Sequence, residues 1–123
     1  MMDIVSFIYV EEDDKDLILS FALDKGDGFV RSLILHRTLF CENLLPEERR
    51  GTKVSLEGEE LGYEQEHLNT LEEFEFDGVT LRMKSSFGNY EVDARKLDAE
   101  ELKAIKQALE RQNYDARFQI KFI

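Results

Sequence analysis

The sequence predicts an α+β fold: a mostly antiparallel sheet of about seven or eight strands, one C-terminal amphipathic helix near residues 98–112 packed on it, and a final strand. Three observations support this prediction. Short runs of alternating apolar residues recur between residues 3 and 94, as strands require. Asp77-Gly78 separates two such runs and predicts a hairpin. A capping box opens the one stretch with clear helical periodicity.

The first third predicts an antiparallel meander of three strands, at residues 3–11, 16–24 and 29–37. The first run is apolar and β-branched on both faces, which is typical of a central strand. The second places four apolar residues at every other position, so one of its faces is expected to be buried. Short polar turns connect the three runs, and the second turn contains two glycines.

The middle of the chain predicts a short strand at 52–59, with Val54 and Leu56 facing inward. Residues 60–70 are ambiguous, because their apolar residues fit one helical face while Gly62 weakens a helix. Both a helix and a structured loop remain open for this segment.

A two-residue turn at Asp77-Gly78 predicts the register of the next hairpin, which spans residues 74–83. On the buried face it pairs Phe76 with Val79 and Phe74 with Leu81. On the opposite face it pairs Glu75 with Thr80, and Glu73 with Arg82 as a cross-strand ion pair.

The remaining elements are a strand at 89–94, the helix and a C-terminal strand at 116–123. Asp98 and Glu101 form the capping box, and Leu97 is expected to pack on Leu102 as a hydrophobic staple. The final strand alternates apolar with polar residues, so it is expected to join the sheet. No repeat or boundary interrupts the chain, and residues 1–123 are predicted to form a single domain.

The net charge of −11 is unevenly distributed. Residues 1–41 carry eight acids and four bases, and residues 78–123 carry seven acids and nine bases. Residues 42–77 carry twelve acids and three bases, a net charge of −9. Such a field repels nucleic acid and steers basic proteins toward the surface.

The apolar run at the N-terminus is short and contains Asp3 instead of a basic residue, unlike a secretory signal. No stretch reaches the length of a membrane span. Cys41 is the single cysteine, so it has no internal disulfide partner and is expected to be a small buried apolar residue. These features predict a cytoplasmic protein that does not contact a membrane.

Catalytic and metal-binding patterns are weak. Glu64 and His67 have the Glu-x-x-His spacing of di-metal sites, but the second such unit is missing, so no metal or cofactor is predicted. His36 and His67 are expected to be structural or solvent-facing. No nucleophile elbow or phosphate loop is present, so no catalytic residue is predicted. A hydrolase that uses carboxylates remains an alternative, which a pocket with perturbed acids would indicate.

Binding is the class that remains. Residues 57–77 contain nine carboxylates and no lysine or arginine, and Tyr63 could anchor a partner among them. The alternative is an acidic face that serves solubility alone. The predicted partner-binding residues are Glu57, Glu59, Glu60, Tyr63, Glu64, Glu66, Glu72, Glu73 and Glu75.

The chain also resembles the immunity protein 10 family of bacterial polymorphic toxin systems. The resemblance covers roughly residues 16–112 and lies in the run Leu33-Ile34-Leu35-His36-Arg37, in Gly62-Tyr63, in the alternating hairpin and in the closing Asp-x-Glu-Glu-Leu helix. It implies a cytoplasmic antitoxin that binds a cognate toxin domain, for example a nuclease with a basic cleft. The alternative is a small acidic structural or regulatory adaptor, or a homodimer paired through an edge strand.

Overall fold

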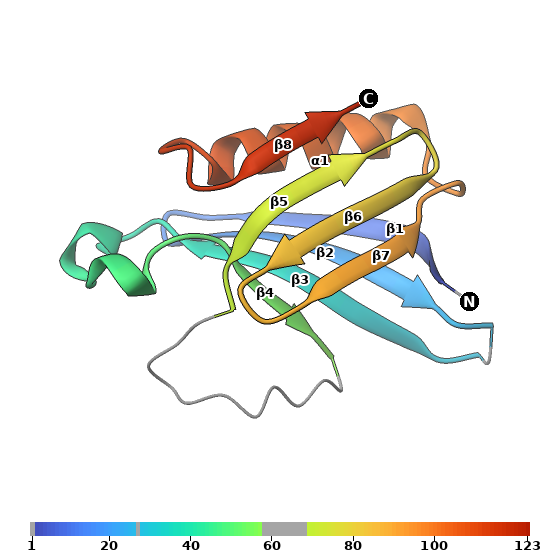
Figure 1. The fold of residues 1–123 in the computed structure, drawn as a ribbon, viewed down its shortest axis with the longest axis horizontal. Coiled ribbons are helices and arrows are strands. Elements are labelled where there is room, and N and C mark those ends of the chain that lie inside the picture. Colours follow the sequence, from blue (N-terminus) through green and yellow to red (C-terminus); the bar gives the residue numbers. More distant parts are fainter. Residues whose placement is uncertain (1, 27, 58–68) are drawn as a thin grey trace.

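The computed structural model describes residues 2–26, 28–57 and 69–123. These ranges contain eight strands, one α-helix and two short 3-10 helices. Figure 1 shows how they are arranged. In chain order the elements are β1 (Asp3–Glu12), β2 (Asp16–Asp24), β3 (Val30–Thr38), η1 (Glu42–Leu44), η2 (Glu47–Arg49), β4 (Lys53–Leu56), β5 (Leu71–Phe76), β6 (Thr80–Ser85), β7 (Asn89–Asp93), α1 (Ala99–Gln112) and β8 (Gln119–Phe122).

The strands form one eight-stranded sheet in the order β4-β3-β2-β1-β7-β6-β5-β8. Neighbouring strands are antiparallel except at two junctions, where β1 pairs with β7 and β5 pairs with β8. The predicted α+β fold is therefore confirmed, including the meander β1-β2-β3 and the final strand. The first parallel junction is short, because only Asp3 and Ile4 of β1 have partners on β7.

The sheet bends back on itself, so that the half β1–β4 faces the half β5–β8 (Figure 1). The start of β4 meets the start of β5, where the N–H of Val54 donates to Asn69 at 2.8 Å and the N–H of Leu71 donates to Thr52 at 2.8 Å. Phe21 of β2 stacks on Phe74 of β5 across the interior, with ring centroids 6.4 Å apart. The core therefore lies between the two halves.

The helix α1 contacts β1 and β2 and buries Ile105, Ala108 and Leu109 in this core. Its predicted capping box is present: Asp98 accepts from the N–H of Glu101, and the Glu101 side chain accepts from the N–H of Asp98. At the other end the buried Gln112 donates to the carbonyl groups of Leu17 and Leu35, both at 3.0 Å. These two bonds fix the helix end to β2 and β3.

The hairpin β5–β6 forms, but its predicted register is wrong by two residues. Phe76 pairs with Leu81 and Phe74 pairs with Met83, while Val79 lies exposed in the turn. The Asp77 carboxylate accepts from the N–H groups of Val79 and Thr80, at 2.9 and 2.8 Å, and thereby moves the turn to Gly78-Val79. A shift of two keeps Phe74 and Leu81 on the core face, but it places Arg82 opposite Glu75 instead of Glu73.

Candidate protein-binding surfaces

The structure describes four of the nine predicted partner-binding residues. They are Glu57, which follows β4, and Glu72, Glu73 and Glu75 on β5. The other five lie outside the described residues: Glu59, Glu60, Tyr63, Glu64 and Glu66.

The four described carboxylates occupy two different parts of the sheet. Glu57 is exposed and continues the pairing of β4 with β3, since its N–H donates to Ser32 at 2.9 Å. Glu73 and Glu75 lie on the outer face of β5, opposite Lys84 and Arg82 of β6. Glu72 is exposed at the β-bulge that precedes Glu73. The sequence stretch therefore does not correspond to one continuous acidic surface among the described residues.

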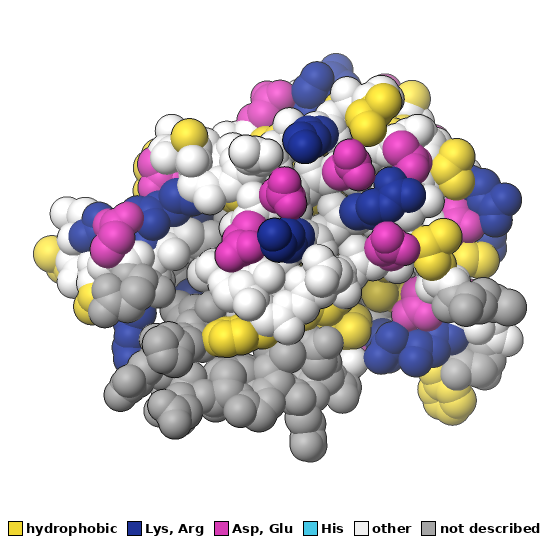
Figure 2. All heavy atoms as spheres, viewed as in Figure 1, with side chains coloured by type: hydrophobic (Ala, Val, Ile, Leu, Met, Phe, Trp, Pro, Cys, Tyr) yellow, Lys and Arg dark blue, Asp and Glu magenta, His cyan; other side chains and the backbone are white. Residues whose placement is uncertain are grey.

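The outer face of β5–β8 carries charges of both signs in register. One row across the four strands reads Lys121, Glu75, Arg82 and Glu91, and the next reads Gln119, Glu73, Lys84 and Asn89. Figure 2 shows the basic and acidic side chains interleaved over β5, β6 and β7. Opposite charges in directly paired positions stabilise a sheet, so this face, here called the charge ladder, has a structural explanation.

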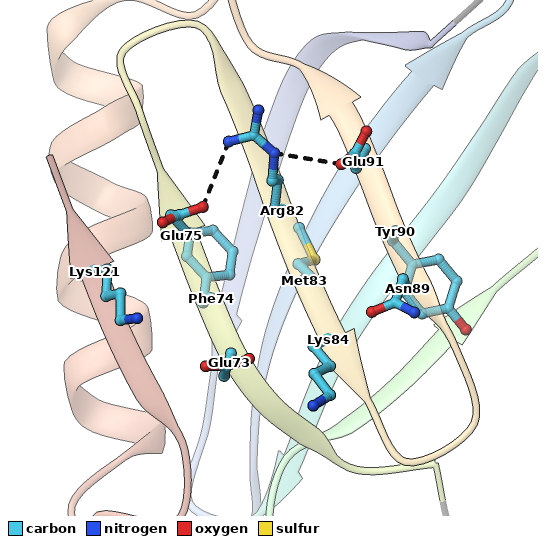
Figure 3. Close-up of a pocket in the computed structure, with 10 residues that line it drawn as sticks. All are labelled: Glu73, Phe74, Glu75, Arg82, Met83, Lys84, Asn89, Tyr90, Glu91 and Lys121. Atoms are coloured by element: carbon cyan, nitrogen blue, oxygen red, sulfur yellow. Dashed lines mark hydrogen bonds and ion pairs between the residues drawn. The ribbon is translucent and has the colours of Figure 1, made fainter.

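The charge ladder surrounds a depression of about 310 Å³ (Figure 3). Because Phe74, Met83 and Tyr90 are buried, their backbone forms the floor while charged side chains form the walls. The lining residues are Glu73, Phe74, Glu75, Arg82, Met83, Lys84, Asn89, Tyr90, Glu91 and Lys121.

Arg82 is the centre of the charge ladder. Its guanidinium contacts Asp77 at 2.9 Å, Glu91 at 3.3 Å and Glu75 at 3.4 Å. The N–H groups of Thr80 and Val79, followed by the Arg82 side chain, lower the pKa of Asp77 to about 2. The same carboxylates raise the pKa of Arg82, with the hydrogen bond to Asp77 as the largest cause. Asp77 and Arg82 are thus both ionised at neutral pH, and the opposite charges of this face largely compensate one another.

The outer face of β1–β4 is different, because it exposes aromatic residues. The sequence suggested that both faces of β1 are buried, but Phe7 is 55% exposed and Tyr9 is 58% exposed. The core-facing residues of β2, from Leu17 to Leu23 in alternation, pair with the opposite side of β1. We call this surface the aromatic face; its members are Phe7 and Tyr9 of β1, Ile18, Ser20 and Ala22 of β2, and Ser32 and Ile34 of β3.

Carboxylates border the aromatic face at both ends of its strands. Glu11 and Asp16 lie at the end near the β1–β2 turn, and Asp24 and Glu57 lie at the other end. Lys53 on β4 is the cation in these rows, next to His36, whose Nε2 lies 2.7 Å from Asp16. Within these rows of β1–β4 the carboxylates outnumber the cations, while Arg95 and Lys96 lie beside Ile4, the partner of Asp24.

A buried arginine forms a third cluster, which sequence reasoning missed. Arg37 of β3 is fully buried and contacts Glu42 at 2.5 Å and Asp115 at 2.8 Å. It also donates to the Gln112 carbonyl at 2.5 Å and lies 4.3 Å from the centre of the Tyr114 ring. The cluster joins β3, the η1 turn and the end of α1. The sequence did contain a signal for its burial: Arg37 lies two residues after Leu35 and four after Leu33, so on a strand it faces the same side as these buried leucines.

The charges in this cluster stabilise one another. Burial opposes the charge of Arg37, but hydrogen bonds to Asp115 and Glu42 outweigh this effect and raise its pKa. Burial likewise opposes the charge of Glu42, whereas Arg37 and the N–H of Gly51 bring the pKa below its usual value. The hydrogen bond from Arg37 is the largest cause that lowers the pKa of Asp115. All three groups are therefore ionised at neutral pH, and the cluster is structural.

Two predictions about single residues have different outcomes. Cys41 was expected to be buried, but it is exposed, because it adopts a left-handed backbone conformation (φ 60°) that turns the chain out of β3 into η1. His36 is half-buried and bound to Asp16, as the structural interpretation predicted, and His67 lies outside the described residues.

Within residues 2–26, 28–57 and 69–123, no group of three or more histidine, cysteine, aspartate or glutamate side chains is arranged to hold a metal ion. None of the helices in that part of the chain combines the length and the apolarity that a membrane span needs. Comparison of the chain with protein-family models, with curated proteins and with solved structures finds no match.

Proposed function

We propose that this protein binds and neutralises a basic protein partner, as a cytoplasmic immunity protein without catalysis of its own. The partner would be a cognate toxin domain, for example a nuclease whose basic cleft attracts phosphate. An acidic protein can occlude such a cleft, because it competes for the same cationic side chains.

The observation that carries this proposal is the acid excess of residues 42–77 together with the exposure of two of its described carboxylates. This segment has a net charge of −9. In its described part Glu57 and Glu72 are both exposed, and they flank the portion centred on Tyr63. The resemblance to the immunity protein 10 family supports the same conclusion from the sequence.

A capture experiment tests this function. The tagged chain is incubated with lysate of the native host at low and at moderate salt, beside the variant Glu57→Lys/Glu72→Lys. A matched control is Glu100→Lys/Glu110→Lys, which makes the same charge change on exposed positions of α1. We expect wild type and control to retain one basic protein that the first variant loses, with weaker capture at moderate salt.

The captured protein must then behave as a toxin. Its expression should arrest growth, and co-expression of the wild-type chain should relieve the arrest. A partner that is acidic, or one that wild type and both variants retain equally, would contradict the proposed function.

A further inference from the structure

We infer that the aromatic face is the docking surface for a protein that presents basic side chains around an apolar patch. This inference rests on the proposed function and names the surface that would serve it. The first reason is the exposure of two aromatic side chains at neighbouring outward positions of β1. Phe7 is 55% exposed and Tyr9 is 58% exposed. Neighbouring apolar side chains that form a patch rimmed by polar residues indicate an interaction site, whereas single exposed apolar side chains do not.

The second reason is the shape that the register gives this face. Phe7 pairs with Ala22 and Tyr9 pairs with Ser20, so each ring stands beside a small side chain. Ser32 follows in the row of Phe7, and Ile34 follows in the row of Tyr9. Two rings next to a low surface of small and aliphatic residues can receive the apolar centre of a partner. The few residues that dominate the binding energy of protein interfaces are enriched in tyrosine, tryptophan and arginine, so Tyr9 is a candidate anchor.

The third reason is the charge at the border, which selects the partner. Glu11 and Asp16 border the face at one end of the strands, and Asp24 and Glu57 border it at the other. Lysine or arginine side chains placed around an apolar patch would face carboxylates at both ends. Complementary charge of this kind speeds association and rejects acidic partners.

The same border disfavours a second copy of this chain. A two-fold symmetric contact brings one surface against itself. Because carboxylates lie at both ends of the strands, stacking two copies in either orientation places acid opposite acid, with Lys53 as the compensating cation within these rows. The aromatic face therefore fits a cationic partner better than a homodimer.

The charge ladder does not compete for this role. Its acidic side chains already have basic partners in the same rows, as Glu75 has Arg82. A cationic partner docking there would have to displace these contacts. At the aromatic face, by contrast, the exposed rings and the bordering carboxylates are presented together.

Selection from a random peptide library displayed on phage tests the inference without knowledge of the natural partner. The library is panned against the wild-type chain alone, and the selected peptides are then tested for binding to Phe7→Ser/Tyr9→Ser. The control is Phe87→Ser, since Phe87 is a 43% exposed aromatic in the turn between β6 and β7. Circular dichroism and thermal unfolding establish that all three proteins are folded.

We expect the selected peptides to combine lysine or arginine with aromatic or aliphatic residues. Their dissociation constants, measured by fluorescence anisotropy, should rise by about 10-fold or more in the double variant, as for loss of a hot spot, and should not change in Phe87→Ser. Affinity for wild type should fall as salt is added. Peptides without basic residues, or peptides that bind the double variant equally well, would overturn the inference. So would a dimer in light scattering that Phe7→Ser/Tyr9→Ser dissociates.

The outcome is separable from that of the proposed function. A captured toxin whose affinity is the same for wild type and for Phe7→Ser/Tyr9→Ser would leave the immunity function intact and refute this surface. Basic peptides that require Phe7 and Tyr9, found together with an absence of any toxin in the host, would refute the function and retain the surface.

Discussion

The outer faces of the two halves of the sheet differ in their side chains. On β5–β8 the carboxylates Glu75 and Glu91 lie in one row with Arg82, and the face compensates its own charge. On β1–β4 the rings of Phe7 and Tyr9 are more than half exposed, and carboxylates border them. The number of acidic residues in a segment therefore does not locate a binding surface. What matters is whether the neighbouring strands supply their counter-charges.

Two arginines, Arg37 and Arg82, each form ion pairs with more than one carboxylate, but they differ in burial. The side chain of Arg37 is fully buried, whereas that of Arg82 is 42% exposed. Water screens the second cluster and is excluded from the first. Both clusters are made of ion pairs between an arginine and carboxylates, but only the buried cluster is expected to have a large effect on the free energy of unfolding.

The largest effect is therefore expected at Arg37. Replacing it with methionine leaves Glu42 buried without its cation, and the free energy of unfolding should fall by about 3–5 kcal/mol. Adding Glu42→Gln should recover part of this loss. Urea denaturation measures both variants. The matched change Arg82→Met should alter stability little, and equal losses at the two arginines would break the comparison.

Acid should act through the same cluster. The pKa values of Glu42 and Asp115 are lower in the folded chain than in the unfolded chain, so folding is favoured while both are ionised. This contribution is complete above about pH 5 and is lost as the pH falls toward the folded pKa values. Urea denaturation from neutral to acid pH should show this loss in wild type and a much shallower one in Arg37→Met. Parallel pH profiles would exclude the cluster as the cause.

The register of the charge ladder should depend on its turn. Gly78 has a φ of +99°, and an added Cβ would meet no atom within 4 Å, so only backbone conformation opposes a side chain there. Gly78→Ala is expected to lower the free energy of unfolding by about 1–2 kcal/mol. Thermal or urea unfolding measures it. An unchanged stability would mean that the turn does not require the positive φ.

The smallest expected effect concerns the rate of association with a basic partner. Neutralising the border of the aromatic face, with Glu11→Gln, Asp24→Asn and Glu57→Gln, should slow association several-fold at low salt. Neutralising Glu73 and Glu75 on the charge ladder should change this rate less, because Glu75 has a cross-strand cation and Glu73 faces Lys84. Stopped-flow fluorescence or surface plasmon resonance measures the association rate constants of the two sets of variants. The reverse order would show that β5–β8 is the face that meets the partner.

Much of the fold could be predicted because its signals are local. Alternation placed the strands of the meander, and Asp98 with Glu101 marked the start of α1. The hairpin register could not be predicted from Asp77-Gly78 alone, because the Asp77 side chain accepts the N–H groups of Val79 and Thr80 and so selects a different turn.

The candidate surfaces were harder to predict because they depend on long-range pairing. The sequence grouped Glu57 with Glu73 and Glu75, but β4 and β5 meet only at their first residues. Phe7 and Tyr9 are exposed because the other side of β1 pairs with the core-facing residues of β2, and this register is not visible in the sequence of β1 alone. The contacts of Arg37 with Asp115 join positions that are distant in sequence, and nothing local predicts them.

The most direct test maps the contact itself by NMR. The isotope-labelled chain is titrated with the basic protein captured from the host, and amide chemical shifts are followed along every strand. We predict that the largest changes lie on β1, β2 and β3 around Phe7, Tyr9 and Ile34, with small changes at Glu73, Glu75 and Arg82. Changes centred on the charge ladder, with none at Phe7 and Tyr9, would contradict the assignment of the aromatic face as the docking surface.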